Sequence, residues 1–275
     1  MKKLFVLLML VFTCVLAGCG KVAFNEKSGK LVIGLECEYA PFNWTETKKT
    51  DSNVPIDGQS GLYAEGYDIQ IAKRLADSLG YELVVKKIAW EGLIPALQSG
   101  DIDAIIAGMS PTEERKESIN FTEQYYRSEH VVLVNASGRF ANASRFSDFA
   151  NANIIGQKGT AYEELANQLA AKANTTAQAP LATVPLIVSS ILLGDTDVTV
   201  VEKPVALGVC AANPQIKWIK LDDEFEVDEC EQIVSIGVRK VDADLLNKLN
   251  DALAKISEEE RETLMVNAVN ANSQE

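Results

Sequence analysis

The sequence predicts an α/β protein of two lobes, each a sheet flanked by helices. The chain has 275 residues, of which 47% are hydrophobic, and this is enough for a packed core in each lobe. Between residues 31 and 107, short apolar runs typical of strands alternate with runs of helical periodicity. That order predicts a parallel sheet with helices packed on it. The alternation starts again after residue 134. Periodicity alone allows two sequential domains as well as a second lobe inserted within the first.

The first half of the chain begins with the apolar run LVIGL at 31–35, which is typical of a strand. Residues 45–61 are rich in Thr, Ser, Asp, Pro and Gly without periodicity, so we expect a long surface loop there. Apolar residues at helical spacing predict a helix over 69–79, with Asp68 as its N-terminal cap and Gly80 at its end. The following runs predict a strand, a short helix and a strand at 82–88, 91–98 and 102–107.

The second half repeats the pattern with a strand at 153–156 and helices at 162–172 and 184–193. A strand at 197–201 leads into a helix that starts at 204–210. The remaining predicted strands lie at 216–221 and 233–238, and the chain after them is expected to be helical with a polar tail.

The N-terminus is typical of an export signal. Lys2 and Lys3 precede a nearly continuous apolar run over 4–16, and a helix of that length spans about 20 Å, short of the roughly 30 Å of a membrane core. We therefore predict a signal peptide over 1–18. The LAGC sequence at 16–19 resembles the bacterial lipobox. It predicts that Cys19 is acylated, for example with palmitate, and that 19–30 tethers the fold to the extracytoplasmic face of the cell membrane. The alternative is an ordinary signal peptide with a chance cysteine.

The charge balance excludes two classes of protein. A formal net charge of -13 and a pI near 4.7 argue against a nucleic-acid partner, because phosphate contacts need a basic face. The 26 basic and 39 acidic residues spread along the chain argue against a multi-pass membrane protein.

Cysteine and histidine usage gives weaker signals. Cys37, Cys210 and Cys230 remain in the mature chain, an odd number in an oxidising compartment, so one disulfide and one free thiol can form. Cys210–Cys230 is the least committed pairing. The chain has no CxxC motif, and its single histidine, His130, has no partner at ligand spacing. We therefore predict neither a metal nor a cofactor.

Two polar and aromatic stretches directly follow predicted strands, where ligands bind in parallel α/β sheets. The rings of ECEYAPFNW at 36–44 can wall a pocket or cover the core of the lobe. The stretch AGMSPTEER at 107–115 offers close backbone approach at Gly108, a hydroxyl at Ser110 and a guanidinium at Arg115 that can pair bidentately with a carboxylate. The alternative for this second stretch is a helix cap followed by a solvated arginine.

The second half offers a complementary group. The glycine-bracketed turn GQKGT at 156–160 opens a helix and suits an anionic group, but it lacks the GxxxxGK[ST] pattern of a phosphate loop. Glu202 ends an apolar run, where its carboxylate can receive an ammonium group or lie at a helix N-terminus. Arg115 and Glu202 together predict a site for the two charges of a zwitterion.

Seven segments carry a resemblance to one known family. They are YAPFNW (39–44), GYDIQIAKRLADSLG (66–80), WEGLIPALQSGDIDAIIAGMSPTEER (90–115), INFTEQYY (119–126), IGQKGT (155–160), DVTVVEKPVA (197–206) and SIGVRK (235–240). Over about residues 31–256 the chain resembles the family 3 extracellular solute-binding proteins, the amino-acid receptors of ABC importers. The segment at 90–115 is the most specific of the seven.

The resemblance implies a two-lobed, periplasmic-binding-protein-like type II fold. Lobe 1 would comprise 31–132 and 235–275, and lobe 2 would comprise 133–234. Two hinge crossings are expected, near 131–135 and 233–235. The resemblance also implies a monomer whose lobes close over a free amino acid, with an ABC importer permease as its partner.

The resemblance further implies a role for each candidate side chain. Arg115 would clamp the ligand carboxylate, helped by Ser110 and the backbone at Gly108, and Glu202 would take the ammonium group. The other matched positions would supply aromatic walls, polar contacts from the second lobe and an acid at the far end of the ligand side chain: Tyr39, Trp90, Gln157, Thr160 and Glu36. Ala161 departs from the family, because many relatives carry Thr or Ser there.

The sequence leaves the bound amino acid open. Glu36, with Glu38 nearby, favours lysine or arginine, because an acid can pair with a cationic tip while Tyr39 and Trp90 cover the aliphatic stem. Glutamine or another polar amino acid is the alternative. Some proteins of this fold are cyclohexadienyl dehydratases, in which a pocket acid acts as a general acid, but no nucleophile or metal motif supports an enzyme here. An adhesin or a sensory receptor without transport is a third class.

Overall fold

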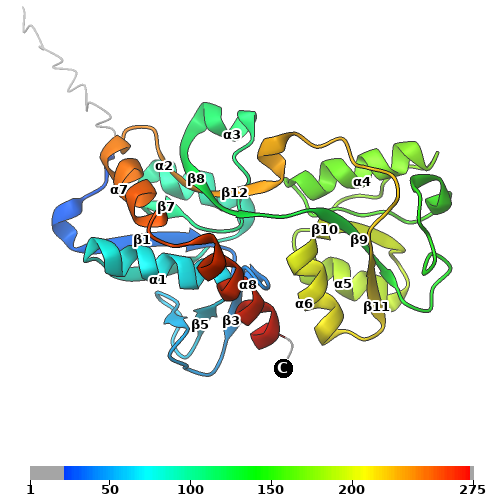
Figure 1. Cartoon of the computed structure of the whole chain (residues 1–275), viewed down its shortest axis with the longest axis horizontal. Coiled ribbons are helices and arrows are strands. Elements are labelled where there is room, and N and C mark those ends of the chain that lie inside the picture. Colours follow the sequence, from blue (N-terminus) through cyan, green and yellow to red (C-terminus); the bar gives the residue numbers. More distant parts are fainter. Residues whose placement is uncertain (1–21, 273–275) are drawn as a thin grey trace, which may run out of the picture.

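The computed structural model describes residues 22–272, which form two lobes joined by two crossings (Figure 1). Lobe 1, on the left, contains a five-stranded sheet in the order β6-β1-β7-β12-β8. Lobe 2, on the right, contains a three-stranded sheet in the order β10-β9-β11. Helices flank both sheets, which confirms the predicted two-lobed α/β fold.

The sheet of lobe 1 is parallel in three of its strands. As predicted, β1 (Lys30–Leu35) pairs in parallel with β6 (Glu82–Lys87) and with β7 (Ala104–Ile105). β12 (Ile233–Arg239) returns from lobe 2 and pairs antiparallel with β7 and with β8 (Ile119–Arg127). The periodicity did not predict β8, because its buried and exposed residues do not alternate regularly.

Helices α1 (Tyr67–Leu79), α2 (Leu93–Ser99), α3 (Glu113–Ser118) and α7 (Ala243–Leu253) belong to lobe 1, with short 3-10 turns at η1 (Glu26–Ser28) and η2 (Trp90–Gly92). The last helix, α8 (Glu258–Asn272), packs against α1 of lobe 1 and against α6 (Lys203–Ala212) of lobe 2. The prediction that Asp68 caps α1 is wrong. Gly66 holds the cap position with φ of 124°, because a Cβ there would lie 2.4 Å from the Phe42 carbonyl oxygen. Asp68 lies inside the helix, fully buried, and accepts hydrogen bonds from Asn43 Nδ2 and the Tyr125 hydroxyl.

The predicted long loop at 45–61 is wrong in part. The chain around it forms a second, four-stranded sheet in the order β2-β3-β5-β4. Its strands are β2 (Glu38–Tyr39), β3 (Asn43–Glu46), β4 (Val54–Pro55) and β5 (Tyr63–Glu65). Strands of two to four residues show no hydrophobic period, so only their pairing with one another defines them.

Lobe 2 is built on β9 (His130–Asn135), β10 (Val198–Glu202) and β11 (Ile216–Ile219), and both β10 and β11 pair antiparallel with β9. Helices α4 (Ala161–Lys172), α5 (Val184–Leu193) and α6 (Lys203–Ala212) pack on it, with 3-10 turns at η3 (Phe146–Phe149) and η4 (Glu229–Glu231). The predicted strand at 153–156 is only a single bridge, between Ile154 and Val198. The Ile155 N–H donates to the Val198 carbonyl oxygen and the Asn153 carbonyl oxygen accepts from the Val198 N–H, so the segment contacts β10 without extending into a strand.

The two crossings between the lobes run together. Ser128 N–H donates to the Gln232 carbonyl oxygen over 2.9 Å, and Arg127 forms an ion pair with Glu229 at 2.8 Å. Strand pairing puts both crossings slightly earlier than predicted: β9 already pairs with β10 at His130, and β12 already pairs with β8 at Ile233. The bounds of the lobes, 31–132 with 235–275 and 133–234, stay a prediction.

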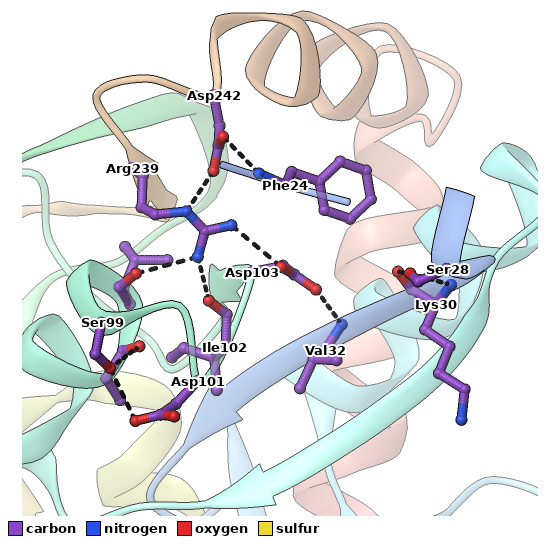
Figure 2. A network of polar contacts seen from close by, with 12 residues as sticks. Phe24, Ser28, Lys30, Val32, Ser99, Asp101, Ile102, Asp103, Arg239 and Asp242 are labelled. Carbon is purple, nitrogen blue, oxygen red and sulfur yellow. Dashed lines mark hydrogen bonds and ion pairs between the residues drawn. The ribbon is translucent and has the colours of Figure 1, made fainter. Parts of the chain in front are cut away.

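The predicted tether is attached to lobe 1 over its described part. The Phe24 ring packs edge-on against Tyr81, and the Phe24 N–H donates to Asp242 Oδ1 over 2.8 Å. Figure 2 shows how Arg239 orients that aspartate: its guanidinium lies between Asp242 and Asp103 and also faces backbone carbonyl oxygens. The predicted signal peptide and Cys19 lie outside the described residues. Within 22–272, no helix has the length and apolarity to cross a membrane.

The suggested Cys210–Cys230 disulfide is wrong in this structure, where Cys37, Cys210 and Cys230 are all free. The three thiols lie in different places. Cys210 is on α6, where the Trp218 backbone contacts it, whereas Cys230 is in η4 near Lys116 of α3. Cys37 is buried in lobe 1 beyond β1.

Candidate functional site

A pocket lies where the two lobes meet, and it brings together all nine predicted ligand-binding residues. Its lining is Glu36, Tyr39, Trp90, Gly108, Ser110, Arg115, Gln157, Thr160, Ala161, Tyr162 and Glu202. The lobe 1 residues follow the ends of β1, β6 and β7, and Glu202 ends β10. This is the edge at which parallel α/β sheets place ligand sites.

The guanidinium of Arg115 lies on the lobe 1 side of the pocket. Thr112 caps α3 by accepting a hydrogen bond from the Arg115 N–H, which fixes the start of the helix. The guanidinium donates to the carbonyl oxygens of Ser110 (2.9 Å) and Gly159 (3.3 Å), and it lies 5.2 Å from the centroid of the Trp90 ring. No carboxylate among residues 22–272 forms an ion pair with it. A planar cation without an acidic partner is suited to a carboxylate ligand.

Burial lowers the pKa of the Arg115 guanidinium, against the opposing charges of Glu114, Glu164 and Glu231. An arginine stays protonated despite such a shift. The site therefore holds a partly desolvated positive charge.

Gly108 faces the pocket in a conformation that suits glycine. Its φ is +60°, and a Cβ would lie 2.7 Å from Tyr39 Cε1. The Gly108 N–H donates to the Tyr125 hydroxyl over 3.0 Å. Because the N–H is already used, a ligand contact at Gly108 would involve its carbonyl oxygen, which accepts from an ammonium group and cannot bind a carboxylate.

Glu202 supplies the opposite charge from lobe 2. Its side chain is buried, and its Oε2 atom has no hydrogen-bond partner among the described residues. Burial raises the pKa of Glu202 to about 8, the charge of Asp68 adds to the rise, and the hydroxyls of Tyr39 and Tyr162 oppose it. A buried carboxylate oxygen without a partner is costly. A cation in the pocket would remove that cost.

Glu36 and Gln157 meet across the pocket from different lobes. Gln157 Nε2 donates to Glu36 Oε2 (3.3 Å) and to the Ala182 carbonyl oxygen (3.1 Å). Burial raises the pKa of Glu36 to about 7; the Gln157 hydrogen bond lowers it and the charge of Glu38 raises it further. This acid lies on the lobe 1 wall that also carries Tyr39.

The Thr160 side chain forms hydrogen bonds with backbone groups of its own turn. Its hydroxyl accepts from the Tyr162 N–H (3.1 Å) and donates to the Gln157 carbonyl oxygen (2.8 Å), so it caps α4 and its one hydrogen is not free for a ligand carboxylate. Ala161, where the resemblance noted a missing hydroxyl, lies at the first position of this helix and lines the pocket. The helix N-terminus favours an anionic group near it.

The Trp90 indole closes one end of the pocket by donating from Nε1 to the Gly159 carbonyl oxygen over 3.0 Å. Near that end, Lys158 of lobe 2 forms an exposed ion pair with Glu91 at 2.9 Å. The lobes are therefore in contact around the pocket, as in a closed form.

Tyr162 is a pocket residue that the sequence analysis missed. It was assigned only to the start of a helix, and its spacing with Leu165, Ala166 and Leu169, all buried, is that of a core position. The sequence feature that points to Tyr162 as a pocket residue is its position two residues after Thr160, directly beside the turn at 156–160.

His130 is not among the residues that line the pocket. Burial lowers the pKa of His130 to about 4, so its ring is neutral at pH 7. Among residues 22–272, no group of three or more His, Cys, Asp and Glu side chains is placed to hold a metal ion.

The buried acids predict a pH dependence of stability. Burial raises the pKa values of Glu36 and Asp68 to about 7 and that of Glu202 to about 8. The folded state thus binds protons that the unfolded state releases near pH 4, and the stability they give is lost as pH rises through 7 to 8. His130 has the opposite sign, but only below its ordinary pKa of 6.5. In thermal unfolding without ligand, we expect the midpoint to fall between pH 6.5 and 8.5. A constant midpoint would contradict this, and Glu202→Gln should reduce the slope.

Comparisons with known proteins find one family and several amino-acid-binding relatives. The model of the bacterial extracellular solute-binding proteins, family 3, matches residues 31–266. The arginine-binding extracellular protein ArtP of Bacillus subtilis (strain 168) is 28% identical over 257 residues, which cover 92% of each chain. The ABC transporter glutamine-binding protein GlnH of the same strain is 26% identical, over 94% of this chain and 91% of its own.

Two solved structures share the fold of this chain. The amino acid ABC transporter substrate-binding protein AbpA of Streptococcus pneumoniae Canada MDR_19A, bound to L-arginine, superposes with a TM-score of 0.75 at 25% identity, covering 91% of this chain and 98% of its own. An ancestral arginine-binding protein bound to arginine has a TM-score of 0.70 at 27% identity, covering 87% of this chain and 97% of its own. That likeness spans both lobes.

Proposed function

The chain belongs to the family 3 bacterial extracellular solute-binding proteins, and we propose that it captures a free amino acid between its lobes and delivers it to an ABC importer. A ligand that contacts both lobes selects the closed form from an equilibrium of open and closed forms. The closed, ligand-bound form would then be the form that the importer recognises. The family is one of receptors, so no chemical step is assigned to the pocket.

One observation carries the proposal: the pocket holds an arginine that forms no ion pair with an acid of the described chain and, from the other lobe, a carboxylate oxygen without a donor. Burial disfavours the charged form of both groups, since it raises the pKa of Glu202 and lowers the pKa of Arg115. An α-amino acid has a carboxylate and an ammonium group in one small molecule, and it would satisfy both. The carbonyl oxygen of Gly108 and the N-terminus of α4 would add contacts to the ammonium and carboxylate groups respectively.

A cationic amino acid, arginine or lysine, fits the remaining lining best. Glu36 can pair with a guanidinium or ammonium tip, and the rings of Tyr39 and Trp90 can cover the aliphatic stem. Two of the similar proteins, ArtP of B. subtilis and AbpA of S. pneumoniae, are named or solved with arginine. Glutamine is the second candidate. Its amide could replace the bond between Gln157 and Glu36, and a similar B. subtilis protein is named as glutamine-binding.

A thermal-shift screen tests the proposal. The mature chain with Cys19→Ser is mixed with each of the twenty amino acids at 1 mM. A ligand present at about 100 times its Kd stabilises the folded state by about 2.7 kcal/mol, which is roughly 5–10 °C for a chain of this size. We expect arginine and lysine to give the largest shifts. If glutamine alone shifted the midpoint, the cationic preference would be wrong, and no shift with any amino acid would refute the receptor function.

Glu202→Gln should separate ligand binding from folding. The variant keeps the shape of the side chain but removes the charge that would pair with the ammonium group, a loss of about 2–5 kcal/mol for a buried pair. Titration calorimetry with L-arginine should show at least a 30-fold weaker Kd. The ligand-free variant should unfold at the same or a higher temperature, because a buried carboxylate without a partner is gone. Unchanged affinity would remove Glu202 from the ammonium contact.

We also propose that the mature protein is held at the outer face of the membrane by acyl chains on Cys19 and acts as a monomer. The LAGC sequence supports the anchor, and membership of an extracellular family supports the compartment. Intact-mass measurement of the protein extracted from membranes should give a chain that starts at Cys19 with added acyl mass. A chain that begins elsewhere, or carries no added mass, would contradict the anchor.

A further inference from the structure

The hydroxyl of Tyr162 lies where the two lobes meet beside Glu202. It is hydrogen-bonded to the hydroxyl of Tyr39, which belongs to lobe 1. It also accepts a hydrogen bond from the backbone N–H of Glu202, over 3.2 Å. We call Tyr39 and Tyr162 the phenol pair. Through this pair, lobe 1 is connected to the residue that supplies the negative charge of lobe 2.

Both members of the phenol pair are held rigidly by their own lobes. The backbone of Tyr162 is fixed by the Thr160 cap, and the chain at Gly156 packs so closely that a Cβ there would lie 2.3 Å from the Tyr162 carbonyl oxygen. The Tyr39 ring stacks on Phe42 with centroids 5.1 Å apart, and it lies so close to Gly108 that a Cβ there would lie 2.7 Å from Tyr39 Cε1. Neither ring can move far without disturbing its core.

The number of hydrogens and acceptors in the phenol pair leaves one hydroxyl hydrogen for another group. The Tyr162 oxygen accepts from the Glu202 N–H, and one phenolic hydrogen is used between the two rings. The second phenolic hydrogen remains for the carboxyl group of Glu202, whose Oε2 has no partner in the described chain. A phenylalanine would fill the same space, so packing alone does not explain why hydroxyls occupy a fully buried place.

We propose that Tyr162 is a positioning residue of the binding site: its hydroxyl fixes Glu202 for the ammonium group of the ligand and, through Tyr39, ties that contact to closure of the lobes. This inference rests on the proposed function and adds a residue to it. The consequence is selective. Loss of the hydroxyl affects the part of the affinity that comes from the ammonium group, and leaves the contacts of Arg115 and of the ligand side chain in place.

The test compares two probes on Tyr162→Phe: L-arginine, and 5-guanidinopentanoic acid, which lacks only the α-amino group. Titration calorimetry gives the affinity of wild type and variant for both. For a hydrogen bond that supports a charged contact, we expect L-arginine to bind about 10- to 100-fold more weakly to the variant. The deaminated probe should change by less than about 3-fold. Small-angle X-ray scattering should show that L-arginine compacts wild type more than the variant at equal saturation.

Tyr67→Phe is the matched control, because Tyr67 also packs on Phe42 but its hydroxyl donates to the Tyr125 carbonyl oxygen over 2.7 Å and lies outside the phenol pair. It should leave both affinities unchanged. Tyr39→Phe should reproduce the loss seen in Tyr162→Phe, and the double variant should lose little more, because the two hydroxyls act as one unit. Equal weakening of both probes in Tyr162→Phe would show a merely structural role and overturn the inference, as would unchanged affinity for L-arginine. If wild type bound both probes equally, the ammonium role of Glu202 would be wrong and the inference would fall with it.

Discussion

Replacing Arg115 with alanine should weaken the binding of L-arginine by about 2–5 kcal/mol, which is roughly 30-fold to several thousand-fold in Kd. The guanidinium is partly desolvated, held by the carbonyl oxygens of Ser110 and Gly159 and by the Trp90 ring, and it forms no ion pair with an acid among the described residues. Without it, the ligand carboxylate would be buried against neutral groups. Titration calorimetry on the purified variant measures the loss directly.

Two further variants separate charge from geometry at this position. Arg115→Lys keeps the charge but loses the planar fork, so it should recover only part of the affinity. Lys116→Ala is the control on the same helix: Lys116 forms an exposed ion pair with Glu113 at 2.8 Å, and its removal should leave the Kd unchanged. If Arg115→Ala bound L-arginine like wild type, the carboxylate contact would have to come from elsewhere in the pocket.

The largest effect on folding is expected from Arg239→Met. Arg239 Nε lies 2.6 Å from Asp242 Oδ2, and Nη2 lies 3.1 Å from Asp103 Oδ1, with the arginine side chain 5% exposed and that of Asp242 2% exposed (Figure 2). Removing one partner leaves buried charge uncompensated and costs about 3–5 kcal/mol. For a chain of this length the unfolding midpoint should drop by roughly 6–15 °C.

A surface arginine provides the comparison. Arg127 pairs with Glu229 at 2.8 Å, but its side chain is 45% exposed, so Arg127→Met should cost less than about 1 kcal/mol. Adding Asp242→Asn to Arg239→Met should restore part of the stability, since it removes the buried carboxylate that has lost its partner. Equal midpoints for the two single variants, measured by calorimetry, would mean that the buried network contributes little.

The sequence predicted most of the site because the chemistry follows the ends of strands. Glu36 and Tyr39 come after β1, Ser110 and Arg115 after β7, and Glu202 ends β10, and these ends converge between the lobes. Spacing supplied the candidates and the resemblance supplied the roles. Trp90 in particular lies in a short turn whose pattern says nothing about a ligand.

The parts that the sequence could not predict depend on partners distant along the chain. Tyr162 has the spacing of a core residue, and only the folded chain places its hydroxyl against that of Tyr39. Asp68 is a residue type that often caps helices, but Gly66 holds the N-cap position of α1 and the Asp68 side chain is buried inside the helix. The strands around 45–61 are too short for a period, so only their pairing reveals them.

If Cys19 carries a lipid, the attachment of the N-terminal segment to lobe 1 limits how far the protein can stand from a bilayer. Val22 lies against Gly100, and Phe24 is fixed to Asp242, so with a lipid on Cys19, as proposed, only Gly20 and Lys21 separate the acyl group from folded chain. Three residue steps reach at most about 10 Å. A linker of this length would not let the protein move away from the membrane. Lobe 1 would lie on the lipid headgroups, and lobe 2 would move relative to lobe 1 when the ligand is captured.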